Sequence, residues 1–514
     1  MKKIVGMGAA VALAASMFGA EPVANPQVLE FKGNASVEWG VDLDSKKTGF
    51  KNSTDAQLKF KLFDGGSKST EGSGIWAELK IKSDDDGNPA WKAENGTPTI
   101  KEALIDTAKI HIYNFYVGIQ KGDTETGEFK PQAAIVSDKA WLVNVGPAGF
   151  TQGLVFGYDD SNIDAKVDFR SFEDTSEKTP TQYTNAYAIA AEATMKDANE
   201  WVEGLEVKGG VSYNFSKNYY EKAANNLAVK KFALKHGINS VEGSILGYSG
   251  SVAYKVALDD KYYIKPMAGI VGDVLSGELG TVDYLRNGNE FVASVLFGWG
   301  AQVDANAGVP FLDGDDAKKV TPGVSVVFTM PLPIKETMDS KDKSTYVRDI
   351  AKIVPSIYSG DIFDGLKFGA YSEIILMRDE VEVGSGYIKD ACADKDRATA
   401  IAIAAGASYD VKAGDVTITT KAGARYANKA YVENSFINKD KDGKEVGLFK
   451  DLGYAKDDEG YLNLKIGADI NGLLDNTTFF VNYTSANLLN ETDYADDYYA
   501  VKAGTLNVGA KIHF

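Results

Sequence analysis

The chain has 514 residues, 44% of them hydrophobic, and a formal net charge of -17. Its mean hydropathy of -0.21 argues against a bundle of membrane helices, and its negative charge argues against nucleic acid as a partner, because phosphate binding needs a basic surface. The single cysteine, Cys392, cannot form an intramolecular disulfide.

The first predicted element is a secretory signal peptide at residues 1–20. Lys2 and Lys3 give it a basic start, an apolar and small-residue run covers residues 4–18, and a small-residue exit follows. Its removal takes the net charge to -19. No later stretch approaches the roughly twenty apolar residues of a membrane helix. We therefore expect an exported chain that enters a membrane only as a closed barrel of strands.

The segment LEFKGNASVEWGVDL, residues 29–43, alternates apolar or small residues with mostly polar ones. Strands in soluble sheets average about five or six residues, whereas a tilted transmembrane strand needs about nine to eleven. The length of the alternation therefore predicts a strand that crosses a bilayer. Its predicted membrane-facing positions are Leu29, Phe31, Val37, Trp39 and Val41, and its predicted inward positions are Glu30, Lys32, Glu38 and Asp42.

The same period recurs along the rest of the chain. The clearest later run, residues 291–305, contributes four more predicted membrane-facing positions: Phe291, Val295, Phe297 and Trp299. We count roughly eighteen to twenty such runs, each weak by itself. They predict an all-β fold, a large antiparallel transmembrane β-barrel. A secreted soluble β-protein also alternates, but it rarely needs runs of this length.

The connections between the runs have two sizes. Short ones, such as residues 258–261 and 473–477, suit periplasmic turns, and long ones suit the outer face of the membrane. The long ones include residues 216–244, 331–365, 379–398 and 428–460. Two of them carry candidate helices, residues 219–235 and residues 344–354, the second with apolar residues at helical spacing and Ser344 as its cap.

The chain ends on an alternating run, TLNVGAKIHF. A barrel must close, so we expect this last strand to pair with the first. Its alternate residues and its aromatic last residue also match the sorting signal of bacterial outer-membrane barrels. The residues of that predicted signal are Leu506, Val508, Ala510, Ile512 and Phe514.

Long strings near both ends carry a family resemblance. Residues 35–63, 74–82, 108–119, 464–489 and 506–514 resemble the treponemal major outer sheath proteins, and the likeness thins in the middle of the chain. The resemblance implies a surface-exposed outer-membrane protein that forms pores, assembles as a trimer and adheres to host extracellular-matrix proteins. It also implies an N-terminal region at residues 25–307 and a membrane-embedded C-terminal region at residues 308–514.

The family resemblance leaves two architectures open. In one, both halves of the chain build a single large barrel; in the other, a smaller C-terminal barrel follows an N-terminal periplasmic β-domain. Membrane-length alternation occurs in both halves and is best in the first run, residues 29–43. The sequence therefore favours the single barrel.

The expected function is a general diffusion porin for small hydrophilic solutes. Barrels of about sixteen to eighteen strands already leave an aqueous channel. The predicted inward residues of later strands are mixed in sign, which predicts no sharp ion selectivity: Lys80, Lys82, Asp164, Lys166, Asp168 and Arg170. The alternative is a membrane-anchored adhesin without a functional pore.

The sequence offers no site for catalysis. Its three histidines, His111, His236 and His513, lack metal-ligand spacing, and no G-x-S-x-G string occurs. A calcium-like loop from Asn438 has Phe449 where a bidentate glutamate is expected. We therefore expect no catalytic residue, no metal and no cofactor; the expected partners are the lipid bilayer, further copies of the chain and host matrix proteins.

Overall fold

The computed structural model describes most of the expected strands. The described residues are 27–43, 46–63, 75–83, 103–120, 152–172, 186–214, 241–279, 282–300, 303–304, 319–338, 341–345, 349–360, 362–377, 399–432, 460–489 and 504–513. The predicted signal peptide, the candidate helix at residues 219–235 and the calcium-like loop lie outside these ranges.

The described residues are nearly all strand. In chain order the strands are β1 (Gln27–Asp42), β2 (Thr48–Phe63), β3 (Ile75–Ser83), β4 (Ala103–Ile112), β5 (Phe115–Gln120), β6 (Gln152–Asp159), β7 (Ile163–Phe172), β8 (Ala186–Met195), β9 (Leu205–Asn214), β10 (Val241–Tyr254), β11 (Val256–Ala257), β12 (Tyr263–Leu279), β13 (Val282–Gly298), β14 (Val303–Asp304), β15 (Lys319–Val320), β16 (Gly323–Pro331), β17 (Ile334–Met338), β18 (Lys341–Thr345), β19 (Asp349–Tyr358), β20 (Leu366–Met377), β21 (Thr399–Ala413), β22 (Val416–Asn428), β23 (Gly460–Leu474), β24 (Thr477–Thr484) and β25 (Thr505–His513). Residues 429–432 form one helical turn after β22.

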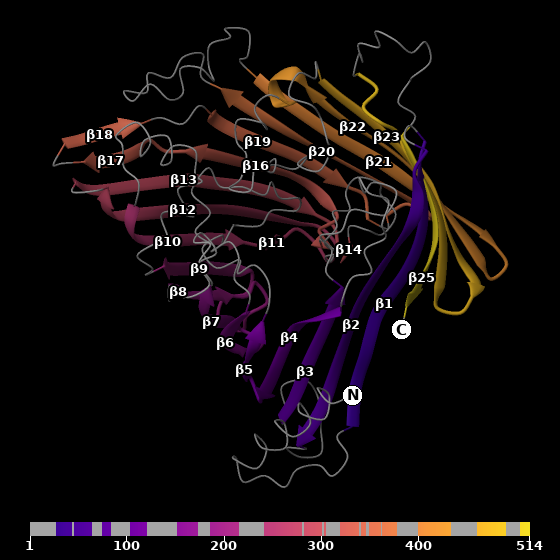
Figure 1. The fold of residues 1–514 in the computed structure, drawn as a ribbon, viewed down its shortest axis with the longest axis horizontal. Helices are drawn as coiled ribbons and strands as arrows, with labels where there is room; N and C mark the ends of the chain where they lie inside the picture. Colours follow the sequence, from indigo (N-terminus) through magenta and orange to yellow (C-terminus); the bar gives the residue numbers. More distant parts are fainter. Residues whose placement is uncertain are drawn as a thin grey trace.

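The strands build one antiparallel barrel (Figure 1). Each pairs with its neighbour along the chain, and the ring closes where β1 meets β25, from Asn34 opposite His513 to Asp42 opposite Thr505. Within the described part of the chain the ring has twenty barrel strands. Five short strands are not counted: β11 continues β10, β17 and β18 form a hairpin beside β13, and β14 pairs only with β15. The predicted barrel and its predicted strand number are confirmed, and so is the pairing of the last strand with the first.

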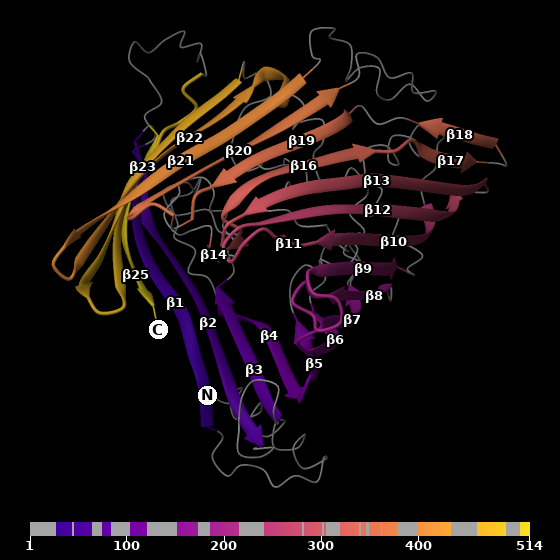
Figure 2. The same ribbon diagram turned by 180° about the vertical axis from the view of Figure 1, so that it is seen from behind.

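Strands from both halves of the chain share this ring. The view from behind shows β1 to β4 directly beside β22 to β25 (Figure 2). The fold is therefore the single barrel, and the bipartite alternative is not the architecture of the described residues. The predicted boundary between residues 307 and 308 lies outside them, so the two family regions remain a prediction.

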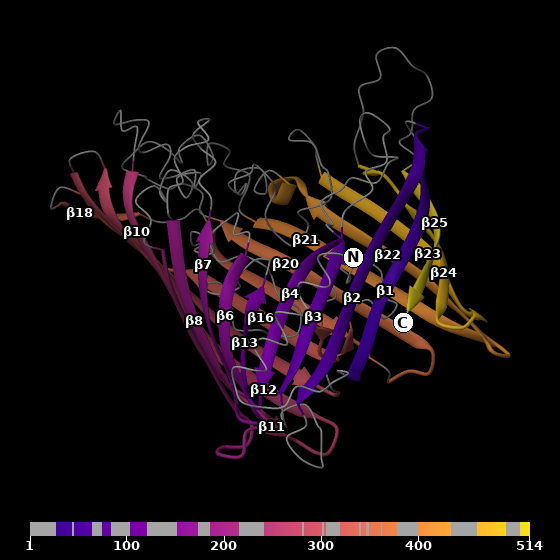
Figure 3. The same ribbon diagram turned by 60° about the horizontal axis from the view of Figure 1, so that its bottom comes forward.

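The two ends of the barrel differ. The end that holds residues 113–114, 160–162, 414–415 and 475–476 has short connections, and we name it the turn end; the opposite end is the loop end. Figure 3 shows the tilted strands running between the two ends. The predicted turns at 258–261 and 473–477 both lie at the turn end. One long connection, residues 299–322, also lies there.

Side chains organise the turns. In the turn at residues 196–204, the buried Asn199 donates from Nδ2 to the carbonyls of Lys196 (2.6 Å) and Leu205 (2.9 Å), and its Oδ1 accepts from the backbone N–H of Val202. In the next turn, the backbone N–H groups of residues 262 and 261 donate to Asp259 and hold the pKa of its carboxyl below the usual range.

The predicted helix at residues 344–354 is wrong. Its described residues, 344–345 and 349–354, lie in β18 and β19 instead, and β19 pairs with β16 on one side and β20 on the other. Pro355 follows directly, and proline inside a helix removes a hydrogen bond and clashes with the preceding turn. Strand pairing on both sides therefore overrides the helical spacing. The predicted connection at residues 331–365 is correspondingly shorter, since it holds β17, β18 and β19.

The predicted run at residues 291–305 also ends early. β13 stops at Gly298, and the backbone N–H of Trp299 donates to the carbonyl of Pro322 (3.0 Å), which starts the connection to β16. Val303 is in β14, outside the barrel sheet. The apolar alternation in the sequence therefore continues beyond Gly298, where the chain leaves the barrel sheet.

Candidate pore lining

The outer face of the barrel is apolar. Alternate residues of a strand point to opposite faces of the sheet, and the side chains of one face remain exposed although they are large and hydrophobic. Among the predicted membrane-facing positions, Phe31, Val37, Trp39, Val295 and Phe297 are exposed. Val41 and Phe291 share this face and are half-buried, while the side chain of Leu29 lies outside the description. Exposing so many apolar side chains to water would be unfavourable in free energy, so this face is suited to contact with lipid.

The remaining predicted positions within the described residues lie just after β13 and on β25. Trp299 lies one residue beyond β13, and its indole Nε1 donates to the carbonyl of Ser359 (2.8 Å). On β25, Val508 and Ile512 are exposed on the outer face, which Leu506 and Ala510 share; Phe514 lies outside the described residues. The roles of these residues in membrane contact and sorting remain predictions.

The inner face is polar and charged over much of the ring. Lys166 on β7 pairs with Glu192 on β8 (Nζ–Oε1, 2.6 Å). Lys265 on β12 lies 3.1 Å from carboxylate oxygens of both Asp197 and Glu206. These ion pairs cross from strand to strand around the lumen, as the mixed signs of the inward residues predict. The inward residues Lys32, Glu38, Asp42, Lys80, Asp164 and Asp168 lie on this face as well.

One inner-face cluster was not expected from the sequence. The rings of Trp76 and His111 stack with centroids 3.6 Å apart, and Tyr116 follows at 5.3 Å. Lys59 lies over the Trp76 ring and Lys109 over the Tyr116 ring. Strand register brings these residues together, because positions 76, 111 and 116 are directly opposed on β3, β4 and β5. No sequence spacing reveals such an alignment.

Glycine makes room for this cluster. A Cβ built on Gly157 would lie 1.9 Å from the ring of Tyr116. The phenol therefore lies flat across β6, where any side chain would displace it.

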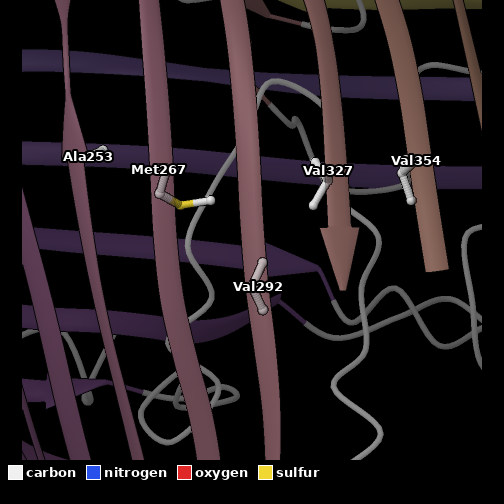
Figure 4. Close-up of a cluster of buried hydrophobic side chains, with 5 residues drawn as sticks. All are labelled: Ala253, Met267, Val292, Val327 and Val354. Atoms are coloured by element: carbon white, nitrogen blue, oxygen red, sulfur yellow. The ribbon is translucent and has the colours of Figure 1, made fainter. Parts of the chain in front are cut away.

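A different part of the inner face is closely packed. Ala253, Met267, Val292, Val327 and Val354 lie on five neighbouring strands and form one buried cluster (Figure 4). Ala253 is opposite Met267, and Val327 is opposite Val354. This apolar packing inside a barrel contrasts with the charged surface on β7 to β9.

The packed region also holds a buried ion pair. Lys352 on β19 and Glu373 on β20 lie 2.5 Å apart (Nζ–Oε1), with 5% and 1% of their side chains exposed. The hydroxyl of Tyr431, in the helical turn after β22, donates to the other carboxylate oxygen (2.5 Å). The backbone N–H of Tyr431 donates to Asn428 Oδ1, which fixes the start of that turn. The chain thus leaves β22 by folding back onto the inner face.

The described residues contain no group of three or more side chains suited to hold a metal ion. Within the described ranges, no helix has the length and the apolar character needed to cross a membrane.

Known surface proteins of treponemes are similar in sequence to this chain. The chain is 26% identical to the major surface protein MspTL of Treponema lecithinolyticum, with both chains covered completely. The chain is a relative of the treponemal major surface proteins. It is also 40% identical to the major outer membrane protein MspA of Treponema maltophilum over 201 residues, 35% of each chain. No family model matches the chain.

Two solved structures with a similar outline are an outer-membrane channel and a porin. The outer-membrane channel DcaP of Acinetobacter baumannii is 10% identical, with 96% of this chain and 98% of that chain covered, at a TM-score of 0.33. A porin refined at 1.8 Å resolution is also 10% identical, with 95% and 100% covered, at a TM-score of 0.31. These scores are low, so the barrel assignment for this relative of the surface proteins rests on its own strand pairing.

Proposed function

We propose that the chain is an outer-membrane porin for small hydrophilic solutes and that its loop-end segments also bind host extracellular-matrix proteins. One observation carries the porin: a closed ring of twenty strands with an apolar outer face and charged inner-face residues. A closed ring leaves no unpaired edge in lipid, and a barrel of this size encloses more than its own side chains fill. The relatives are named a major surface protein and a major outer membrane protein, which supports this location.

Single-channel recording in planar bilayers tests the pore. We expect stable channels from the folded full-length protein and no channels of the same conductance from residues 308–514. That fragment lacks β1 to β13, so β16 and β25 lose the partners that close the ring. Equal conductance from both would place the pore in the C-terminal half alone. Absence of channels from the full-length protein would refute the porin.

The adhesive function is supported by the family resemblance and by the length of the loop-end connections. The longest of these include residues 429–459, whose acidic residues outnumber its basic ones. We expect deletion of residues 433–459 to reduce binding to immobilised matrix proteins while channel conductance persists. Deletion of residues 378–398 serves as the control for loop length. Unchanged binding by both variants would count against adhesion through these segments. Assembly as a trimer is likewise proposed on the resemblance, and cross-linking in membranes tests it.

A further inference from the structure

The inner face of the barrel has two unequal walls. We name a set of inner-face residues of β13, β16, β19 and β20 the covered wall, and none of them is more than 6% exposed: Glu290, Val292, Ser294, Leu296, Ser325, Val327, Thr329, Lys352, Val354, Ser356, Tyr358, Tyr371, Glu373, Ile375 and Met377. Large side chains such as Tyr358 and Ile375 are among them. At the strand ends, Pro331 on β16 and Lys367 on β20 share this face and are half-buried. Little of this wall is open to solvent.

The other side of the ring is accessible. We name the following inner-face residues of β22 to β25 and β1 the open wall, and every one is half-buried or exposed: Thr419, Lys421, Arg425, Lys465, Asp469, Asn471, Thr478, Asn482, Thr484, Asn507, Lys511, His513, Lys32, Asn34, Ser36 and Glu38. Toward the loop end, Ala427 and Asn463 on the same strands are buried. These named side chains are all polar or charged; the half-buried Phe480 of β24, which lies over Gly509, is an apolar side chain on the same inner face.

The two walls differ in chemistry as well as in burial. Most residues of the covered wall are apolar or small. It has three charged residues, Glu290, Lys352 and Glu373, and the last two pair with each other. An ion that loses its water beside such a wall gains few ligands in return. The open wall offers hydroxyl, amide and charged groups that can replace hydration.

We propose that the aqueous path of this barrel is eccentric, running along the open wall, and that it favours small anionic solutes. The open wall carries five basic side chains, Lys32, Lys421, Arg425, Lys465 and Lys511. The same face has three acidic ones: Glu38, Asp469, which pairs with Lys421, and Asp42 at the end of β1. A surplus of one sign along a confined path raises the local concentration of the opposite ion. This inference rests on the proposed porin function and adds the position of the path and the class of solute.

The net charge of the chain, -17, would suggest the opposite selectivity. Charges separated from the path by more than about 8–10 Å of electrolyte are largely screened, however. The side chains that line the path therefore decide which ion enters, and these are basic on balance.

Cysteine accessibility tests the position of the path. On a Cys392→Ser background, Ser36→Cys places a thiol on the open wall and Ser325→Cys places one on the covered wall; both changes are nearly isosteric. A charged methanethiosulfonate reagent should lower the conductance of Ser36→Cys channels in planar bilayers and leave Ser325→Cys channels unchanged. Ser294→Cys is a second covered-wall variant if Ser325→Cys assembles poorly. Equal reaction at both walls would overturn the eccentric path.

Reversal potentials in a potassium chloride gradient test the solute class. The full-length protein should show a reversal potential on the anion-selective side, and the double variant Lys465→Gln with Lys511→Gln should shift it toward cations. As a control, Lys261→Gln removes a positive charge from an exposed turn, and it should shift the reversal potential less than the double variant does. A cation-selective native channel would refute the anion preference. A protein without any channel would refute the porin itself, so the two failures are distinguishable.

Discussion

Replacement of Glu373 by glutamine should destabilise the barrel by about 3–5 kcal/mol, the usual effect of removing one partner of a buried ion pair. Glutamine keeps the volume of the side chain but takes away the charge that lies 2.5 Å from Lys352 Nζ. The same change weakens the acceptor of the Tyr431 hydroxyl, which holds the helical turn after β22 against the inner face. The measurement is the urea midpoint of the folded protein in detergent, followed by tryptophan fluorescence and by heat-modifiable gel migration.

A double variant controls for the buried charge that Glu373→Gln leaves without its partner. Lys352→Met combined with Glu373→Leu replaces both ions by apolar side chains of similar size, and such replacements are often neutral or stabilising. We therefore expect the double variant to regain most of the stability lost by Glu373→Gln. If the single variant unfolds within about 0.5 kcal/mol of the native protein, the pair does not stabilise the fold in the way its burial implies.

Lysine at Val481 should destabilise the membrane-inserted barrel by about 2–4 kcal/mol if that position lies near the bilayer midplane. Val481 is on the outer face of β24 and 38% exposed. A charged side chain there must enter hydrocarbon or reach back to the interface. The measurement is reversible unfolding from lipid vesicles in guanidinium chloride.

The next residue along β24 supplies the matched control. Asn482 faces the lumen, where its side chain lies over Gly467. Lysine at this position remains in contact with water, so we expect less than about 1 kcal/mol of change. Equal losses from Val481→Lys and Asn482→Lys would show that the outer face of β24 is not in contact with lipid.

The alternation of apolar and polar residues predicted both the barrel and its closure by the last strand. This success has a physical reason: each transmembrane strand must present one face to lipid, so every crossing leaves a period of two in the sequence. The same reason explains the failure at residues 344–354. Local spacing there fits a helix, but pairing with β16 and β20 satisfies more backbone groups.

Residues on the inner face were harder to predict. The aromatic stack of Trp76, His111 and Tyr116 depends on the register of three strands, and the ion pair of Lys352 with Glu373 depends on the register of two. No pattern along the chain records which residues of neighbouring strands stand opposite one another. The positive charge balance of the open wall could not be predicted for the same reason. The net charge of the chain sums residues from every part of the structure, whereas the open wall contains only a few of them.

Periodicity within single segments was enough to predict the class of fold, the two faces of each strand and the closing strand. The pairing of strands into one ring from both halves, and the packed and open walls of the lumen, became visible in the folded chain. Those features arise from pairing and burial between segments distant along the chain. Their energies depend on which side chains the closed ring brings together.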